Sequence, residues 1–231
     1  MRSASNRWLL LLDRLIEDWV GMTLPRPVVA MKDFIQEDGC IWCGETIREN
    51  EPCPCAGRRL YWIRVFRLGL YQEPLSASIL RGKYSAWVEM LTLLGQLLGE
   101  RIKGCVPPNS LIVPVPMPLL RRWFRRVDHS HLIAVHASIS SGIPIRRALF
   151  RRNTIPQAAK TASGRKSLPR NAMWLRPWAR IKGKNIILVD DVLTTGKTLE
   201  VAANKLKKGG VSSVQVAVLA VTQLPRKDKK M

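Results

Sequence analysis

The second half of the chain alternates between short apolar runs rich in β-branched residues and segments with helical spacing. Residues 111–115 and 185–189 predict short strands, and the unbroken apolar run 214–221 is typical of a central strand buried on both faces. Residues 197–208 predict a helix, because Leu199, Ala202, Ala203 and Leu206 recur at helical spacing. Residues 185–221 therefore predict a β-α-β unit, and an α/β fold with a parallel sheet covered by helices on both faces.

Three further helices are predicted outside this unit. Residues 7–20, 85–103 and 128–141 each place apolar side chains at helical spacing. In the last of these helices we expect four large aliphatic residues to face the core: Leu132, Ile133, Val135 and Ile139. Residues 61–71 mix aromatic, apolar and basic side chains, which favours one or two short strands.

The remaining segments divide the chain into parts. Residues 153–171 have little periodicity and predict a long loop. We expect an N-terminal helix, linker and cysteine module over residues 1–58, a main domain over residues 59–224, and a basic tail over residues 225–231.

The composition adds a strong positive charge. Thirty-eight Lys+Arg against 17 Asp+Glu give a net charge of +21 in 231 residues, which favours nucleic acid, phosphorylated metabolites or an anionic surface as partners. The alternative explanation of this charge is a basic proteome or a bias toward solubility. The apolar run at residues 9–12 is too short for an export signal, and Glu89 and Gln96 interrupt the longest apolar stretch. We therefore expect a cytoplasmic protein without a membrane span.

Four cysteines cluster between residues 40 and 55. Cys40 and Cys43 precede a glycine as in a zinc knuckle, and Cys53 and Cys55 supply a second pair with an unusual C-x-C spacing. Without an export signal, metal ligation is favoured over disulfides. The cluster predicts a small zinc-ribbon-like module with structural Zn²⁺, and free thiols or a lost metal remain the alternative. Cys105 stands apart, and we expect it in the core.

Two carboxylates and a hydroxyl-rich turn follow the strand at 185–189. Asp190 and Asp191 should emerge at the carboxyl edge of the sheet, where open α/β folds bind ligands. Adjacent carboxylates suit the two hydroxyls of a ribose. The helix start that follows offers free N–H groups to a phosphate, and it contains Thr194, Thr195, Gly196, Lys197 and Thr198. This order predicts a site for ribose 5-phosphate.

A P-loop is excluded for the same segment. Gly196, Lys197 and Thr198 match its end, but the motif requires glycine five positions before Gly196. Asp191 occupies that position, and its carboxylate would repel the phosphates that a P-loop holds.

Residues 186–198 resemble the thirteen-residue signature of type I phosphoribosyltransferases, and the wider chain resembles the ComF (GntX-like) family associated with DNA uptake and competence. The matching parts are the cysteine cluster, residues 71–83 with the following helix, Val113-Pro114-Val115-Pro116, the arginine-rich stretch before Leu132-Ile133-Ala134, Pro156-Gln157 and the C-terminal β-α-β unit. Together they cover nearly everything from about residue 40 onward.

The resemblance implies a type I phosphoribosyltransferase-like fold and a role for each matching residue. Asp190 and Asp191 would hold the ribose hydroxyls at the catalytic centre, and residues 194–198 would surround the 5-phosphate. The loop after residues 111–115 would face the pyrophosphate of phosphoribosyl pyrophosphate, and its candidate charges are Arg121, Arg122, Arg125 and Arg126. Mg²⁺ would bridge pyrophosphate and ribose. The implied activity is that of a glycosyltransferase.

One departure from the family leaves catalysis open. The family's Arg-Gly-Phe-Asn-Gln run is replaced here by Arg125-Arg126-Val127-Asp128-His129. We therefore expect either a ComF-like protein that binds phosphoribosyl pyrophosphate or a nucleotide in DNA uptake or nucleotide salvage, or a non-enzymatic use of the same fold. The latter would be a sensor of phosphoribosyl ligands or an accessory for single-stranded DNA working with competence-machinery proteins. Arginine pairs occur at 121–122, 125–126, 146–147 and 151–152. They favour two explanations equally: a solvated basic face, or contacts of one or two arginines with pyrophosphate and of the others with a nucleic-acid backbone.

Overall fold

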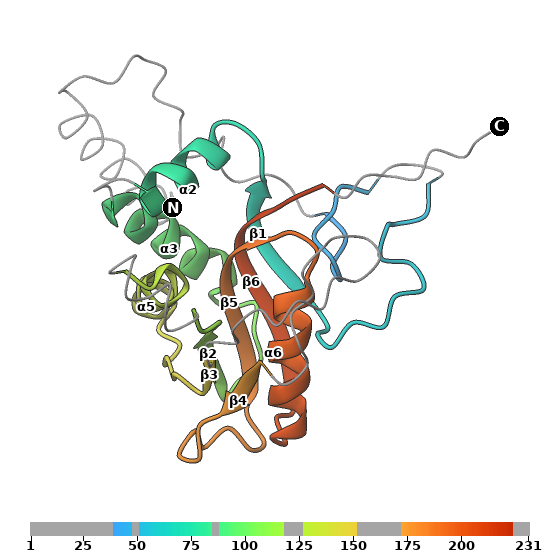
Figure 1. Ribbon diagram of the computed structural model, residues 1–231, viewed down its shortest axis with the longest axis vertical. Coiled ribbons are helices and arrows are strands. Elements are labelled where there is room, and N and C mark those ends of the chain that lie inside the picture. The colour runs from blue at the N-terminus through green and yellow to red at the C-terminus, as the bar shows by residue number, and fades with distance from the viewer. Residues whose placement is uncertain (1–38, 48–50, 85–87, 118–126, 152–171, 224–231) are drawn as a thin grey trace, which may run out of the picture.

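The structure is a computed structural model that describes residues 39–47, 51–84, 88–117, 127–151 and 172–223. Its centre is a parallel sheet of four strands in the order β1-β6-β5-β2 (Figure 1). The strands are β1 (Val65–Leu70), β2 (Ser110–Pro114), β5 (Asn185–Leu193) and β6 (Ser213–Val221). The expected parallel sheet is confirmed, and each predicted strand overlaps an observed one.

The central strand pair is longer than the hydrophobic pattern predicts. β5 continues four residues beyond Val189, and Asp190 pairs with Val218 of β6 while Leu193 pairs with Val221. Asp190 and Asp191 therefore lie within the strand and not in the loop after it. Polar side chains interrupt the apolar pattern here, but the parallel ladder continues because the neighbouring residues of β6 are fully buried and hold it.

Helices cover both faces of the sheet (Figure 1). On one face, α2 (Leu75–Tyr84), α3 (Val88–Ile102) and α5 (His129–Ser141) enclose a core that includes Leu68, Leu98 and Ile187. On the other face, α6 (Lys197–Lys208) and the antiparallel pair β3 (Leu149–Arg151) and β4 (Met173–Leu175) enclose a second core around Leu188 and Val216. α6 has the bounds predicted from its pattern.

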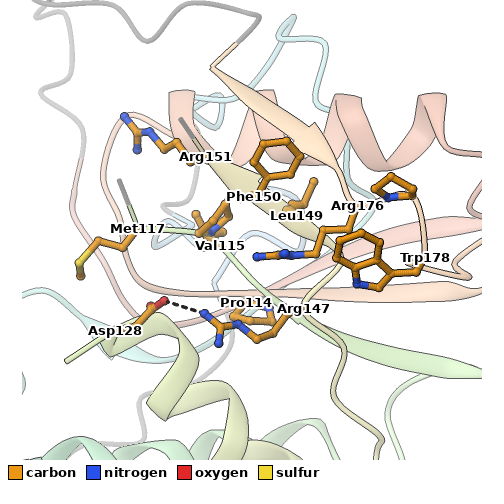
Figure 2. Close-up of a pocket in the computed structure, with 12 residues that line it drawn as sticks. Pro114, Val115, Met117, Asp128, Arg147, Leu149, Phe150, Arg151, Arg176 and Trp178 are labelled. Carbon is orange, nitrogen blue, oxygen red and sulfur yellow. Dashed lines mark ion pairs between the residues drawn. The ribbon is translucent and has the colours of Figure 1, made fainter. Parts of the chain in front are cut away.

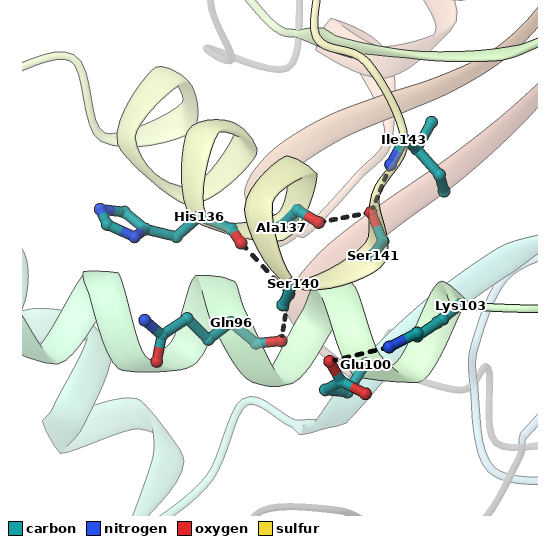
Figure 3. Close-up of polar contacts among 8 residues, drawn as sticks. All are labelled: Gln96, Glu100, Lys103, His136, Ala137, Ser140, Ser141 and Ile143. Carbon is teal, nitrogen blue, oxygen red and sulfur yellow. Dashed lines mark hydrogen bonds and ion pairs between the residues drawn. The ribbon is translucent and has the colours of Figure 1, made fainter.

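α3 and α5 pack at close range through glycines of α3. A Cβ atom added to Gly99 would meet Ser140 Oγ and would lie 2.6 Å from the carbonyl oxygen of Ala137. Ser140 Oγ lies 2.8 Å from the carbonyl oxygen of Gln96 on α3, as Figure 3 shows. This packing fixes α5 against the sheet. It thereby positions the first turn of α5, which contacts the candidate site.

Two sequence-based expectations about side chains are wrong. Ile139 of α5 is 68% exposed, because the helix contacts α3 and the sheet through Ile133 and the small residues Ala134 and Ala137. Cys105 is exposed in the turn after α3 and does not belong to the core. The predicted helix at 7–20, the loop at 153–171 and the basic tail at 225–231 lie outside the described residues.

Among the described helices, none has both the length and the apolar character needed to cross a bilayer.

Candidate functional site

Asp190 and Asp191 lie near the carboxyl end of β5, each held by a different helix. Ser130, in the first turn of α5, donates a hydrogen bond of 2.7 Å to Asp190 Oδ1. Lys83, in the last turn of α2, places its ammonium nitrogen 2.6 Å from Asp191 Oδ2. Two neighbouring carboxylates on one strand therefore receive one neutral and one cationic partner, and both helices pack on the same face of the sheet.

These surroundings give the two carboxyl groups different electrostatic environments. Although part of Asp190 reaches solvent, burial of its carboxyl group and the adjacent charge of Asp191 raise the pKa of Asp190 to about 7. The hydrogen bonds from Ser130 and from the Asp191 backbone oppose that rise, as does the charge of Lys83. Asp190 is consequently poised to lose its proton when a cation or a hydrogen-bond donor approaches.

The turn after β5 enters α6 through a left-handed residue. Gly196 is the N-cap of α6 with φ of 77°, and no side chain caps the helix. The first N–H groups of a helix have no partner inside it, so those after Gly196 face outward. A hollow of about 40 Å³ lies in front of them, and it is lined by Asp190, Val192, Leu193, Thr194, Thr195, Gly196, Lys197, Thr198 and Leu199. Six of the seven residues predicted for ribose 5-phosphate therefore line this hollow, and the seventh, Asp191, is next to Asp190 in β5.

Arg58, which follows the cysteine cluster in the chain, contacts this turn through its guanidinium group. Its Nη2 lies 3.4 Å from the carbonyl oxygen of Thr195 and 3.1 Å from Glu200 Oε1. Glu200 lies in the first turn of α6, where its charge would repel a bound phosphate. The guanidinium group of Arg58 offsets that charge and ties the turn to the neighbouring segment.

Trp62 makes a second connection between the same two regions. Its indole N–H donates a hydrogen bond of 2.6 Å to the carbonyl oxygen of Trp42, which lies between Cys40 and Cys43. The other end of the ring lies beside Gly196. Trp62 is 4% exposed, so its ring fills the space between the cysteine cluster and the turn before α6.

The four clustered cysteines come together as predicted. The Sγ atoms of Cys40, Cys43, Cys53 and Cys55 all lie within 4.8 Å of one another. The Sγ atom of Cys55 lies 3.6 Å from that of Cys40 and 3.3 Å from that of Cys53. In a tetrahedral site with Zn–S bonds of about 2.3 Å, sulfur atoms are roughly 3.8 Å apart. The thiols therefore fit a Cys₄ zinc site despite the C-x-C second pair.

Local backbone geometry supports this arrangement. Gly44 adopts φ of 73°, and its N–H donates to the carbonyl oxygen of Cys40, which closes the knuckle. Burial raises the pKa of Cys43, and it raises the pKa of Cys55 to about 12. Burial also acts on Cys40, but backbone N–H groups of Cys43 and Trp42 lower its pKa. A cation among the four sulfur atoms would favour the ionised form of Cys43 and Cys55.

The arginines proposed for the pyrophosphate, Arg121, Arg122, Arg125 and Arg126, lie outside the described residues. The structure does describe the end of that stretch. Asp128 is the N-cap of α5 and accepts a hydrogen bond from the His131 backbone, and His129 is 3% exposed. Both residues that replace the family's amides therefore have structural roles at the start of α5.

Four residues at the site have no role in the sequence analysis: Ser130, Lys83, Arg58 and Trp62. Each comes from an element far from 186–198 in the chain, and only the sheet and its helices bring them there. Lys83 and Ser130 belong to segments that carry the family resemblance. That coincidence was the one signal in the sequence that pointed to them.

Comparison with known sequences agrees with this geometry. The phosphoribosyl transferase domain family matches residues 135–231. Competence protein F of Haemophilus influenzae is 30% identical over 179 residues, which cover 72% of this chain and 76% of that protein. DNA utilization protein YhgH of Escherichia coli is 30% identical over 197 residues, or 79% of this chain and 84% of that protein.

A solved structure of a purine phosphoribosyltransferase from Pyrococcus horikoshii is 24% identical, with a TM-score of 0.38, over 60% of this chain and 78% of that one. The family match places a phosphoribosyltransferase-type domain over the C-terminal part of the chain, where the β5-α6-β6 unit lies. The two relatives extend the similarity over most of its length. The chain therefore belongs to the competence protein F (ComF) family.

Proposed function

We propose that the segment 190–198 binds the ribose 5-phosphate group of phosphoribosyl pyrophosphate or of a nucleotide. The observation that carries this proposal is the order in which three features lie along one edge of the sheet. Two carboxylates are followed by the hollow of about 40 Å³ and by the uncapped start of α6. The carboxylates accept from the ribose hydroxyls, and the helix start donates to the phosphate.

Mg²⁺ is the cation that this site would use. Carboxylate oxygens are hard ligands, and Mg²⁺ is usually held by one or two of them together with substrate phosphates. Asp190 fits this role because burial and the adjacent charge of Asp191 raise its pKa, and a bound cation would offset both effects. Asp191, which is already paired with Lys83, is then left to orient the ribose.

Ligand binding without phosphoribosyl transfer is the second candidate function. It is favoured by Asp128 and His129, which replace family amides and serve to cap and to pack α5. A chain that keeps the ribose-phosphate residues but uses these two positions structurally would bind the ligand and act as a sensor or an accessory. The residues on the pyrophosphate side of the site therefore decide between transferase activity and ligand sensing.

The biological setting that we propose is DNA uptake. The matched relatives carry the names competence protein F and DNA utilization protein. The net charge of +21 suits a partner with a phosphate backbone, such as single-stranded DNA. We propose that the phosphoribosyl site serves this process, in concert with competence-machinery proteins.

Two measurements on the full chain test these functions. Calorimetric titration with phosphoribosyl pyrophosphate, with and without Mg²⁺, tests binding. We expect measurable binding and a higher affinity in the presence of Mg²⁺. Release of pyrophosphate in the presence of a panel of nucleobases tests transfer. Binding with no pyrophosphate release for any base supports the sensor or accessory. Absence of binding under both conditions would contradict the site itself.

A further inference from the structure

A larger cavity lies apart from the turn before α6. It is situated at the carboxyl end of β2, between that strand and the β3–β4 hairpin, and its volume is about 390 Å³ (Figure 2). Ligand pockets in proteins typically measure about 300–1,000 Å³, so this cavity is large enough for a small organic molecule. It is lined by Pro114, Val115, Pro116, Met117, Asp128, Arg147, Leu149, Phe150, Arg151, Arg176, Pro177 and Trp178.

The cavity offers flat aromatic surface as well as an apolar floor. Val115 and Leu149 are buried beneath it. Phe150 stacks on Trp174 with ring centroids 5.6 Å apart, which fixes its orientation. Trp178 is 66% exposed, so one of the largest apolar side chains of the protein faces solvent at the rim. An exposed indole is costly to leave in water and is well suited to stack on a nucleobase.

Positive charge dominates the same lining. Arg147, Arg151 and Arg176 contribute three guanidinium groups, against the single carboxylate of Asp128. Arg147 is near that carboxylate, with Nη2 3.7 Å from Asp128 Oδ2. The excess of guanidinium over carboxylate selects for an anion.

Arg176 connects the aromatic and the charged features. Its guanidinium carbon lies 5.9 Å from the centroid of the Phe150 ring and 5.8 Å from that of Trp178 (Figure 2). Its Nε atom is buried and has no hydrogen-bond partner among the residues that the structure describes. A buried donor without an acceptor is unfavourable for the folded state. A guanidinium group over two rings presents its terminal N–H groups to phosphate oxygens.

We propose that this cavity binds a nucleotide unit, with the base stacked on Trp178 and the phosphate held by Arg176. The chemistry is shared by a free nucleoside monophosphate and by one nucleotide of a single strand. The proposal does not rest on the phosphoribosyl site. Its residues differ from those of 190–198, and Asp128, the cap of α5, lines the cavity while Ser130 of the same helix contacts Asp190. Pro116 and Met117 of the lining belong to the loop that the family resemblance assigns to the pyrophosphate, so phosphoribosyl pyrophosphate is included in the test.

The test titrates the full chain by calorimetry with deoxyadenosine monophosphate, with a twelve-nucleotide single strand and with phosphoribosyl pyrophosphate. Trp178→Ala and Arg176→Gln remove the stacking face and the phosphate donor. Arg64→Gln is the matched control, because Arg64 lies 4.6 Å over the ring of Phe66 and outside the cavity lining. Circular dichroism confirms that each variant is folded, which the exposure of Trp178 leads us to expect.

We expect both cavity variants to weaken nucleotide binding by about tenfold, in line with the loss of one stacked base, while Arg64→Gln changes nothing. Weaker binding of the monophosphate identifies a free nucleotide as the ligand, and weaker binding of the strand alone identifies single-stranded nucleic acid. Unchanged affinity for both would overturn the proposal. A parallel loss of phosphoribosyl pyrophosphate binding would overturn it too, because the cavity would then belong to the phosphoribosyl site.

Discussion

The ring of Trp62 closes the space beside Gly196, so that a Cβ atom at Gly196 would lie 3.3 Å from Trp62 Cη2. The indole nitrogen of the same side chain is hydrogen-bonded to the backbone between Cys40 and Cys43. The conformation of the turn that would receive the phosphate is therefore set jointly by its own left-handed glycine and by the cysteine-containing segment.

Gly196→Ala should weaken binding of phosphoribosyl pyrophosphate by about tenfold or more, because the turn must shift from Trp62 and from its positive φ. The left-handed conformation alone costs a residue with a Cβ about 1–2 kcal/mol. Gly104→Ala is the matched control, since Gly104 has φ of 72° and open space at its Cβ. Denaturation should show a similar loss of stability in both variants, and calorimetry a loss of affinity only at Gly196. Equal affinities would show that the turn does not contact the ligand.

Asp190 should make both stability and ligand binding depend on pH. Its pKa of about 7 in the folded state lies above the ordinary value of 3.8, so between these values the folded state holds a proton that the unfolded state has lost. Stability should therefore fall as the pH rises from about 4 to about 7. Asp190→Asn should remove this fall, so that the variant matches the wild type near pH 4 and exceeds it in stability at pH 8.

Chemical denaturation at several pH values measures this difference. Binding of Mg²⁺ with phosphoribosyl pyrophosphate should strengthen over the same interval, because the cation competes with the proton for Asp190. A stability difference between wild type and Asp190→Asn that is the same at pH 4 and pH 8 would contradict the assignment.

The cysteine cluster should hold close to one zinc ion per chain. The four thiols fit tetrahedral geometry, and burial raises the pKa of Cys43 and Cys55, so zinc must displace protons and should bind less tightly as the pH falls. Metal analysis and thiol titration of protein purified without chelator measure this. Cys43→Ser should lose the metal, whereas Cys105→Ser should retain it. If the wild type contains little zinc and all five thiols titrate freely, the cluster does not bind zinc and the prediction is wrong.

Gly99→Ala should destabilise the fold through the contact between α3 and α5. The new methyl group would meet Ser140 Oγ and the backbone of Ala137, and overpacking of this kind costs about 1–3 kcal/mol. The neighbouring Glu100, whose side chain is 58% exposed, supplies the control Glu100→Ala. Thermal denaturation should show a lower Tm for Gly99→Ala alone, and an unchanged Tm would mean that α5 shifts freely on α3.

The elements near the candidate site could be predicted from the local sequence because their apolar residues follow a regular pattern. The apolar run of β6 and the i, i+3, i+4, i+7 spacing of α6 gave bounds close to those observed. The pattern failed where packing depends on shape. Ile139 is apolar but exposed, because the small side chains of Ala134 and Ala137 make the helix contact.

The partners of the site residues could not be predicted in the same way. Lys83 and Asp191 are far apart in the chain, and their 2.6 Å contact exists only because α2 ends over the carboxyl edge of β5. The same holds for Arg58 and Glu200. Ion pairs of this kind follow from the relative placement of elements, which no local period encodes.

The central claim is tested most directly by one calorimetric titration of the double variant Asp190→Asn, Asp191→Asn with phosphoribosyl pyrophosphate and Mg²⁺. Each hydrogen bond to a charged group is worth about 1.5–3 kcal/mol, so the variant should bind at least about 100-fold more weakly than the wild type. Glu100→Gln, which removes an exposed carboxylate away from the site, should bind as the wild type does. Unchanged affinity in a double variant that remains folded would contradict the claim that these two aspartates hold the ribose and its magnesium ion.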